Sequence, residues 1–140
     1  IFLDGFSPQK CPEIWSYEFL SQLKNKIKYE GYLITYSSSA AVRKSLKNLG
    51  FNLFNIVPIL SKRNCWSNGT LATFDDNQDN PYIKQLSLME IEHLDTKASI
   101  PYRDPTGGML SNEILENRKK EQQLSNLLET NSWRKKWEMA

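Results

Sequence analysis

Residues 1–15 read IFLDGFSPQKCPEIW, which joins an apolar run, an acidic residue, a turn and a helix start. The apolar run, Ile1 to Leu3, is typical of a buried parallel strand, and it stops at Asp4. Pro12 then favours the first turn of a helix, where its missing N–H is not needed. Ligands of open α/β sheets bind beyond the carboxyl ends of the strands. We therefore expect Asp4 to lie at a functional site.

The next segments predict a second parallel strand that is reached through a helix. Residues 13–30 carry apolar side chains at helical spacing opposite several lysines, and Gly31 is a typical helix stop. Residues 32–36, Tyr-Leu-Ile-Thr-Tyr, are rich in β-branched and aromatic types and favour a strand. A strand, a helix and a second strand make a right-handed crossover in which the two strands are parallel.

The residues that follow are expected to complete the sheet. Three consecutive serines offer hydroxyls to cap a helix that ends at Gly50. Residues 51–57 and 70–74 are strand candidates, and Asn68-Gly69 marks a tight turn before the second of them. This turn chemistry permits a final antiparallel pair.

A polar break at residues 75–82 predicts a boundary between a main part, 1–74, and a helical extension, 75–140. The net charge of the chain is +2, but residues 1–74 hold 9 lysines and arginines against 4 acidic residues. This surplus suits a polyanionic partner such as a nucleic acid. An ordinary solvated surface would account for it nearly as well.

The extension carries two helix-start signals and an aromatic, basic end. Ser87 and Glu90 have the spacing of a capping box that opens a short helix to about residue 96. Ser111 is expected to cap a long, mostly polar helix that reaches about residue 128. Residues 133–137, Trp-Arg-Lys-Lys-Trp, are expected to pack back onto the domain rather than bind RNA. His93 is interpreted as a structural histidine, because no partner stands at metal-ligand spacing.

Cysteine usage and hydropathy exclude several classes of protein. Cys11 and Cys65 lack the spacing of a zinc site and are too few for a disulfide framework. Reduced thiols are the better interpretation, which favours the cytoplasm. The sequence shows no apolar run long enough to span a bilayer and no signal peptide.

Several spaced blocks of the chain resemble the methyltransferase domain of the MnmC family. The blocks in the main part are Asp4-Gly5-Phe6-Ser7-Pro8, Lys10, Pro12-Glu13, Trp15, Gly31 to Ser37, Ala41-Val42-Arg43-Lys44 and Leu49-Gly50-Phe51. In the extension, Glu92-His93-Leu94 and Ile100 to Pro105 resemble stand-alone, cyanobacterial-type relatives that lack the flavin-dependent oxidase domain.

The resemblance implies an α/β fold, namely a Rossmann-like class I S-adenosylmethionine-dependent methyltransferase. The chain would supply the C-terminal half of the sheet, starting at strand four, with parallel strands, a final antiparallel pair and the helical extension. The implied reaction is methyl transfer to the aminomethyl group of wobble uridine in tRNA. The glycine-rich turn and acidic residue that hold S-adenosylmethionine in such enzymes have no counterpart here, so we expect a C-terminal portion or a truncated relative.

The same resemblance assigns roles to individual residues. Asp4 is the catalytic candidate, because its carboxylate can orient an amine and help to remove its proton. The cofactor contacts are expected at Asp4, Gly5 and Phe6, and no metal is expected. The candidate substrate contacts are Ser7, Pro8, Lys10, Tyr36, Ser37 and Arg63. A basic rim for tRNA phosphates is expected at Arg43, Lys44, Lys62 and Arg63, although a charged helix face is the better interpretation of the first two.

Other interpretations of these residues stay open. Asp4 by itself would more often cap the following turn, Phe6 is as typical of a core aromatic, and the serines suit helix capping. A haloacid dehalogenase-type phosphatase is excluded, since it needs an aspartate where Phe2 stands. A non-catalytic RNA-binding or protein-interaction module derived from such an enzyme remains the alternative. A separate amine-generating oxidase or tRNA-modifying complex is a further expected partner.

Overall fold

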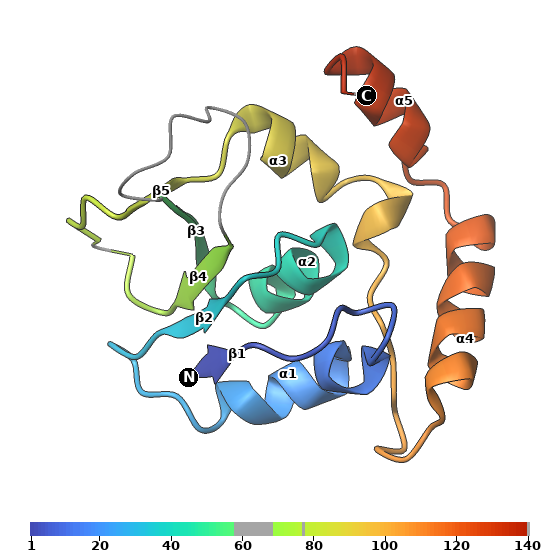
Figure 1. The fold of residues 1–140 in the computed structure, drawn as a ribbon, viewed down its shortest axis with the longest axis horizontal. Coiled ribbons are helices and arrows are strands. Elements are labelled where there is room, and N and C mark those ends of the chain that lie inside the picture. The colour runs from blue at the N-terminus through green and yellow to red at the C-terminus, as the bar shows by residue number, and fades with distance from the viewer. Residues whose placement is uncertain (58–68, 77, 140) are drawn as a thin grey trace.

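The computed structural model describes residues 1–57, 69–76 and 78–139, and these residues build a five-stranded sheet with helices packed against it (Figure 1). The strand order is β1-β2-β4-β3-β5. The strands are β1 (Phe2–Leu3), β2 (Leu33–Thr35), β3 (Asn52–Ile56), β4 (Thr70–Thr73) and β5 (Ile83–Gln85). The helices are η1 (Pro12–Trp15), α1 (Tyr17–Lys24), α2 (Ala40–Asn48), α3 (Leu88–His93), η2 (Lys97–Ser99), α4 (Ser111–Leu124) and α5 (Thr130–Lys136).

The first two strands are parallel, as the crossover pattern predicts. Phe2 lies opposite Ile34 and Leu3 lies opposite Thr35. The carboxyl ends of β1 and β2 therefore meet at one edge of the sheet, and the next residue along each strand is Asp4 or Tyr36.

The predicted antiparallel pair is confirmed, and its second strand enters the middle of the sheet. Strand β4 pairs antiparallel with β2 on one side and with β3 on the other. The turn residue Asn68 lies outside the described residues. Strand β5 pairs antiparallel with β3 and was not indicated by the sequence, because its short segment is largely exposed and shows no alternation. The division of the chain at residue 74 stays a prediction.

The single helix predicted over residues 13–30 is wrong. The chain forms the short helix η1, breaks at Ser16, and begins α1 only at Tyr17. Ser16 has extended backbone angles, and its hydroxyl accepts a hydrogen bond from the Phe19 N–H at 3.2 Å. This side chain is an N-cap, so it favours a new helix start over continuation. Helix α1 then ends at Lys24, before the predicted stop at Gly31.

The other predicted caps have mixed outcomes. The capping box of Ser87 and Glu90 is present at the start of α3. Ser39 stands at the N-cap of α2 but its side chain makes no cap bond, while the Ser37 hydroxyl accepts from the Ser39 N–H instead. Ser111 lies inside α4, where its hydroxyl donates to Glu13. That capping role is therefore wrong, because the hydroxyl ties α4 to η1.

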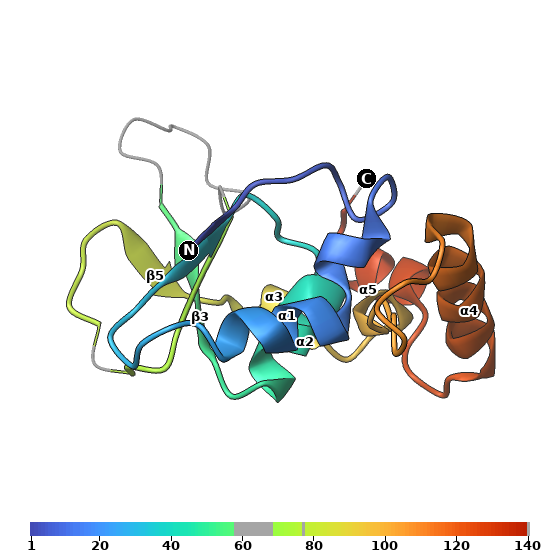
Figure 2. The same cartoon turned by 90° about the horizontal axis from the view of Figure 1, so that it is seen from below.

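Helices α1 and α2 lie between the sheet and α4, as both views show (Figure 2). Their apolar faces enclose a core with the sheet, which includes Trp15, Leu20, Leu33, Val42 and Leu46. None of the helices in the described part of the chain has the length and apolar character needed to cross a membrane.

The C-terminal helix α5 packs back onto α3, as predicted. Trp133 is buried, and its indole N–H donates to the Met89 carbonyl at 3.0 Å. The Trp137 indole N–H donates to Glu92 at 2.9 Å. The His93 ring stacks on Trp133 with 4.1 Å between the centroids. Burial, with added repulsion from Arg43 and Arg134, lowers the pKa of His93 to about 4.

This histidine is expected to make stability depend on pH between about 6.5 and about 4. The ordinary pKa of 6.5 applies in the unfolded chain, so the unfolded state binds more protons in this window. The free energy of unfolding should therefore fall as the pH is lowered through it. A His93→Phe variant keeps an aromatic ring on Trp133 and should show a flatter profile in urea titrations at pH 7, 6 and 5. Parallel profiles for the two proteins would contradict this assignment.

Candidate active site

A hollow opens at the edge of the sheet where β1 and β2 end. Its volume is about 360 Å³, and it is lined by Phe2, Asp4, Ile34, Thr35, Tyr36 and Ile56. Asp4 is exposed and has no hydrogen bond or ion pair with any residue that the structure describes. The structure thus brings two predicted site residues, Asp4 and Tyr36, to one hollow.

The lining of this hollow is mostly apolar around one acidic group. Phe2, Ile34 and Ile56 provide hydrophobic walls, and Asp4 is the charged residue among those that line it. The Tyr36 side chain is half exposed there, at 46%. A carboxylate between aromatic and aliphatic walls favours a cationic group and leaves a flat aromatic surface for a ring to stack on.

The loop that presents Asp4 is fixed mainly through its backbone. The Ser7 carbonyl accepts from the N–H groups of Lys10 and Cys11, at 2.8 and 3.0 Å. The Phe6 carbonyl accepts from the Trp15 indole N–H at 2.7 Å. Ile14 packs against Gly5 so closely that a Cβ at this glycine would overlap its side chain. A larger residue at position 5 would therefore require the Ile14 side chain of η1 to move.

The other predicted contacts that the structure describes are not among the residues that line this hollow. The Phe6 side chain points away from the core and is 73% exposed, and Ser7 and Lys10 are exposed as well. Pro8 is half-buried in the same loop. Ser37 is buried, its hydroxyl accepts from the Ser39 N–H, and its carbonyl accepts from Thr70. The roles assigned to these residues stay predictions.

Arg43 lies neither in a basic rim nor on an exposed, charged helix face, so both interpretations of this residue are wrong. Its side chain is 2% exposed and forms an ion pair with Glu90 at 3.0 Å. The guanidinium also donates to Asn55 at 2.7 Å and to Thr70 at 2.8 Å. Burial raises the pKa of Glu90, but hydrogen bonds from Ser87, Asn55 and Arg43 more than offset this, so its pKa lies below the ordinary value.

Two further members of the expected rim cannot be placed. Lys62 and Arg63 lie outside the described residues. Lys44 is partly exposed on α2 and pairs with Asp95 at 3.2 Å. The structure therefore assigns Arg43 to the interior and Lys44 to a charged helix face.

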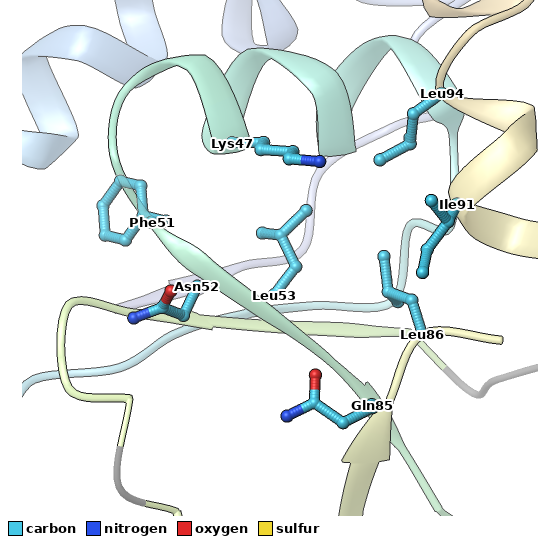
Figure 3. A pocket seen from close by; sticks show the side chains of 8 residues that line it. All are labelled: Lys47, Phe51, Asn52, Leu53, Gln85, Leu86, Ile91 and Leu94. Atoms are coloured by element: carbon cyan, nitrogen blue, oxygen red, sulfur yellow. The ribbon is translucent and has the colours of Figure 1, made fainter. Parts of the chain in front are cut away.

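A second hollow, of about 190 Å³, lies at the opposite end of the sheet (Figure 3). Strand β3 runs in the same direction as β1 and β2, so its first residues lie away from the edge that carries Asp4. The side chains that line this hollow come from α2, β3, β5 and α3, and none was predicted as a site residue. They are Lys47, Phe51, Asn52, Leu53, Gln85, Leu86, Ile91 and Leu94.

Sequence reasoning missed the walls of the first hollow. Phe2, Ile34 and Ile56 read as core positions of apolar strands, yet all three face the open space. The register of β1 on β2 explains this, because Phe2 pairs with Ile34 at the edge strand of the described sheet. The strand pattern carried a signal for this, because alternate residues of a strand point to opposite faces, so Phe2 and Leu3 cannot both face the core.

A parallel pair of strands, an antiparallel strand inserted beside it and a carboxylate at the carboxyl edge together define the fold of a class I methyltransferase. Residues 1–74 match the family described as S-adenosyl-L-methionine-dependent methyltransferase. The chain belongs to this family, whose cofactor is S-adenosylmethionine.

The similarity to individual proteins extends beyond residues 1–74. The crystal structure of MnmC2 from Aquifex aeolicus superposes with a TM-score of 0.74 at 34% identity, over 89% of this chain and 38% of that one. An uncharacterized protein of Methanocaldococcus jannaschii is 31% identical over 121 residues, which are 84% of this chain and 32% of the relative. The tRNA 5-methylaminomethyl-2-thiouridine biosynthesis bifunctional protein MnmC of Campylobacter hominis is 47% identical over 49 residues, or 35% of this chain and 7% of the relative. The chain therefore spans about a third, or less, of the length of these proteins.

The residues present fit the reacting end of S-adenosylmethionine. The sulfonium is a cation, and the exposed Asp4 carboxylate beside the Phe2 and Tyr36 rings is a suitable environment for it or for an amine. In the described residues we find no cluster of three or more histidine, cysteine or acidic side chains that could hold a metal ion.

Proposed function

We propose that the protein, together with the parts that its longer relatives contain, methylates the aminomethyl group of wobble uridine in tRNA. The observation that carries this proposal is the exposed Asp4 carboxylate, which pairs with none of the residues that the structure describes, in a hollow at the carboxyl edge of β1 and β2. The proposal is supported by the similarity to MnmC2 and to the tRNA-modifying MnmC proteins.

The proposed chemistry of Asp4 follows from the acceptor. A primary alkylamine has a pKa of about 10, so at neutral pH it is mostly protonated and lacks a free lone pair. The Asp4 carboxylate accepts a hydrogen bond from this ammonium, orients the nitrogen and takes up or relays its proton. Bound S-adenosylmethionine supplies the electrophilic methyl group.

Positioning is the second contribution of the hollow. The Tyr36 ring, half exposed beside Asp4, offers a surface on which the uracil ring can stack. Holding the two reactants in line is worth about 7–11 kcal/mol when the geometry is correct. Lys10 is exposed in the same loop, and its proposed role is to contact a tRNA phosphate.

The proposal also includes the source of the amine and the cellular compartment of the reaction. A separate oxidase or tRNA-modifying complex supplies the amine, and the reaction takes place in the cytoplasm. The alternative, a non-catalytic binding module, differs from the enzyme in one property that can be measured, which is the binding of S-adenosylmethionine.

Cofactor binding and methyl transfer test this function together. Calorimetry with S-adenosylmethionine is expected to show binding by an extended chain, in which this sequence is joined at its N-terminus to the corresponding region of a longer relative such as MnmC2 of Aquifex aeolicus. Labelled methyl should then enter tRNA that bears 5-aminomethyl-2-thiouridine and not the same tRNA transcribed without modification. If neither the chain of 140 residues nor the extended chain binds the cofactor, the enzyme is excluded and the binding module is favoured. Cofactor binding with equal labelling of both tRNAs would overturn the proposed acceptor.

A further inference from the structure

We infer that Trp15 is a positioning residue of this site, which sets the distance between the Asp4 loop and the Tyr36 ring. The inference rests on the proposed function for its catalytic consequence, but the positioning itself can be measured without activity.

Trp15 anchors the Asp4 loop through a hydrogen bond to the loop backbone. The side chains of Asp4, Phe6 and Ser7 are exposed, so burial does little to fix this segment. The Trp15 indole is completely buried, at 0% exposure, and its N–H donates to the Phe6 carbonyl at 2.7 Å. A buried indole N–H needs such a partner, which fixes the carbonyl two residues after Asp4.

The same indole also contacts the other side of the hollow. The Trp15 and Tyr36 rings meet edge to face, with 6.0 Å between the centroids and 87° between the planes. Aromatic pairs favour this arrangement. One rigid side chain thus touches both the segment that follows β1 and the residue that follows β2. The β1–β2 ladder, in which Leu3 pairs with Thr35, brings Asp4 and Tyr36 to the same edge, and Trp15 adds a link between the two segments beyond the ends of the strands.

Trp15 is in turn held in place from the C-terminal part of the chain. The Tyr17 N–H donates to the Tyr102 carbonyl at 2.9 Å, and Ser16 forms a bridge with Tyr102. The Tyr102 hydroxyl accepts from Gln9 at 3.3 Å, and Tyr102 is itself buried. Glu13 of η1 receives the hydrogen bond from Ser111. The segment around Tyr102 therefore braces the helix that carries the indole.

Trp133 is a matched control in the same chain. It is 1% exposed, its indole N–H also donates to a backbone carbonyl, that of Met89, and its ring also stacks on a neighbour, His93. It belongs to α5, which packs on α3 on the far side of α2 from β1 (Figure 1). Loss of the N–H should cost similar stability at the two positions, but only Trp15 lies against the site.

The test compares Trp15→Phe with Trp133→Phe in the N-terminally extended chain. Backbone amides of residues 4–10 are expected to exchange with solvent faster in the Trp15 variant alone. The kcat for methyl transfer should fall roughly ten- to a hundred-fold in that variant, as for a reactant misplaced by about 1 Å, with the KM for tRNA changed much less. Melting temperatures should drop by similar amounts in the two variants.

A second substitution separates the effect of losing the hydrogen bond from the effect of making the ring smaller. Benzothienylalanine has the shape of tryptophan with sulfur in place of the N–H, so it should fold at either position. At position 15 it should reproduce both the faster exchange and the lower kcat. Unchanged exchange of residues 4–10 with both substitutions would overturn the inference. A wild-type protein without methyl transfer would remove the proposed function, and the exchange measurement would still decide the role of Trp15.

Discussion

Replacing Arg43 with methionine is expected to lower the free energy of unfolding by roughly 3–5 kcal/mol, as is typical when one partner of a buried ion pair is removed. The guanidinium donates hydrogen bonds to side chains on β3, β4 and α3, namely those of Asn55, Thr70 and Glu90. Without it, the Glu90 carboxylate stays buried with only Asn55 and the Ser87 cap to bind it. Urea unfolding measures this loss directly.

Lys44→Met is the matched control for this prediction. Lys44 is the next residue of α2 and also forms an ion pair, with Asp95, whose side chain is 70% exposed. Exposed pairs contribute about 0–1 kcal/mol, so this variant should be nearly as stable as the wild type. Replacing Arg43 and Glu90 together by methionine should restore part of the loss, because no buried charge is then left alone. Equal losses for Arg43→Met and Lys44→Met would contradict the buried network.

The largest effect on activity is expected from Asp4→Asn, which should lower kcat/KM by about 10²–10⁴. The amide keeps the size of the side chain but cannot accept the proton of the substrate ammonium or balance its charge. Stability should change little, since Asp4 is exposed and has no partner among the described residues. Steady-state methyl transfer to the aminomethyl tRNA, with a thermal melt of each variant, measures both quantities.

Asp76→Asn controls for the loss of one exposed acidic charge. Asp76 is exposed beyond the end of β4 and does not line the hollow. This variant should transfer methyl at the wild-type rate. A folded Asp4→Asn protein with unchanged kcat/KM would remove Asp4 from the mechanism, whatever the behaviour of the control.

Local patterns in the sequence were enough to predict the parallel pair, whereas the final antiparallel pair followed from the family resemblance and was only permitted by the turn chemistry. The apolar run before Asp4 and the β-branched run at residues 32–36 each form a strand. The break at Ser16 was missed because an N-cap serine inside an apolar helical period is easily taken for a surface position. Helix existence was thus clearer than helix boundaries.

Long-range polar contacts account for most of what the sequence did not predict. Arg43 reads as a charged position on a helix face, and its burial depends on Glu90, which is 47 residues further along the chain. The meeting of Asp4 with Tyr36 followed from the crossover rule, but the joint contact through Trp15 depends on the tertiary packing of η1. Strand β5 is defined by its pairing with β3, from which it is separated by β4 along the chain.

The most direct test of the account is a crystal structure of the N-terminally extended chain with S-adenosylhomocysteine, the product left after methyl transfer. We expect its sulfur to face the hollow at the carboxyl edge of β1 and β2, with the Asp4 carboxylate and the Tyr36 ring on the side from which the amine approaches. Cofactor bound elsewhere, for example in the hollow beneath Lys47, with Asp4 left facing solvent, would contradict it.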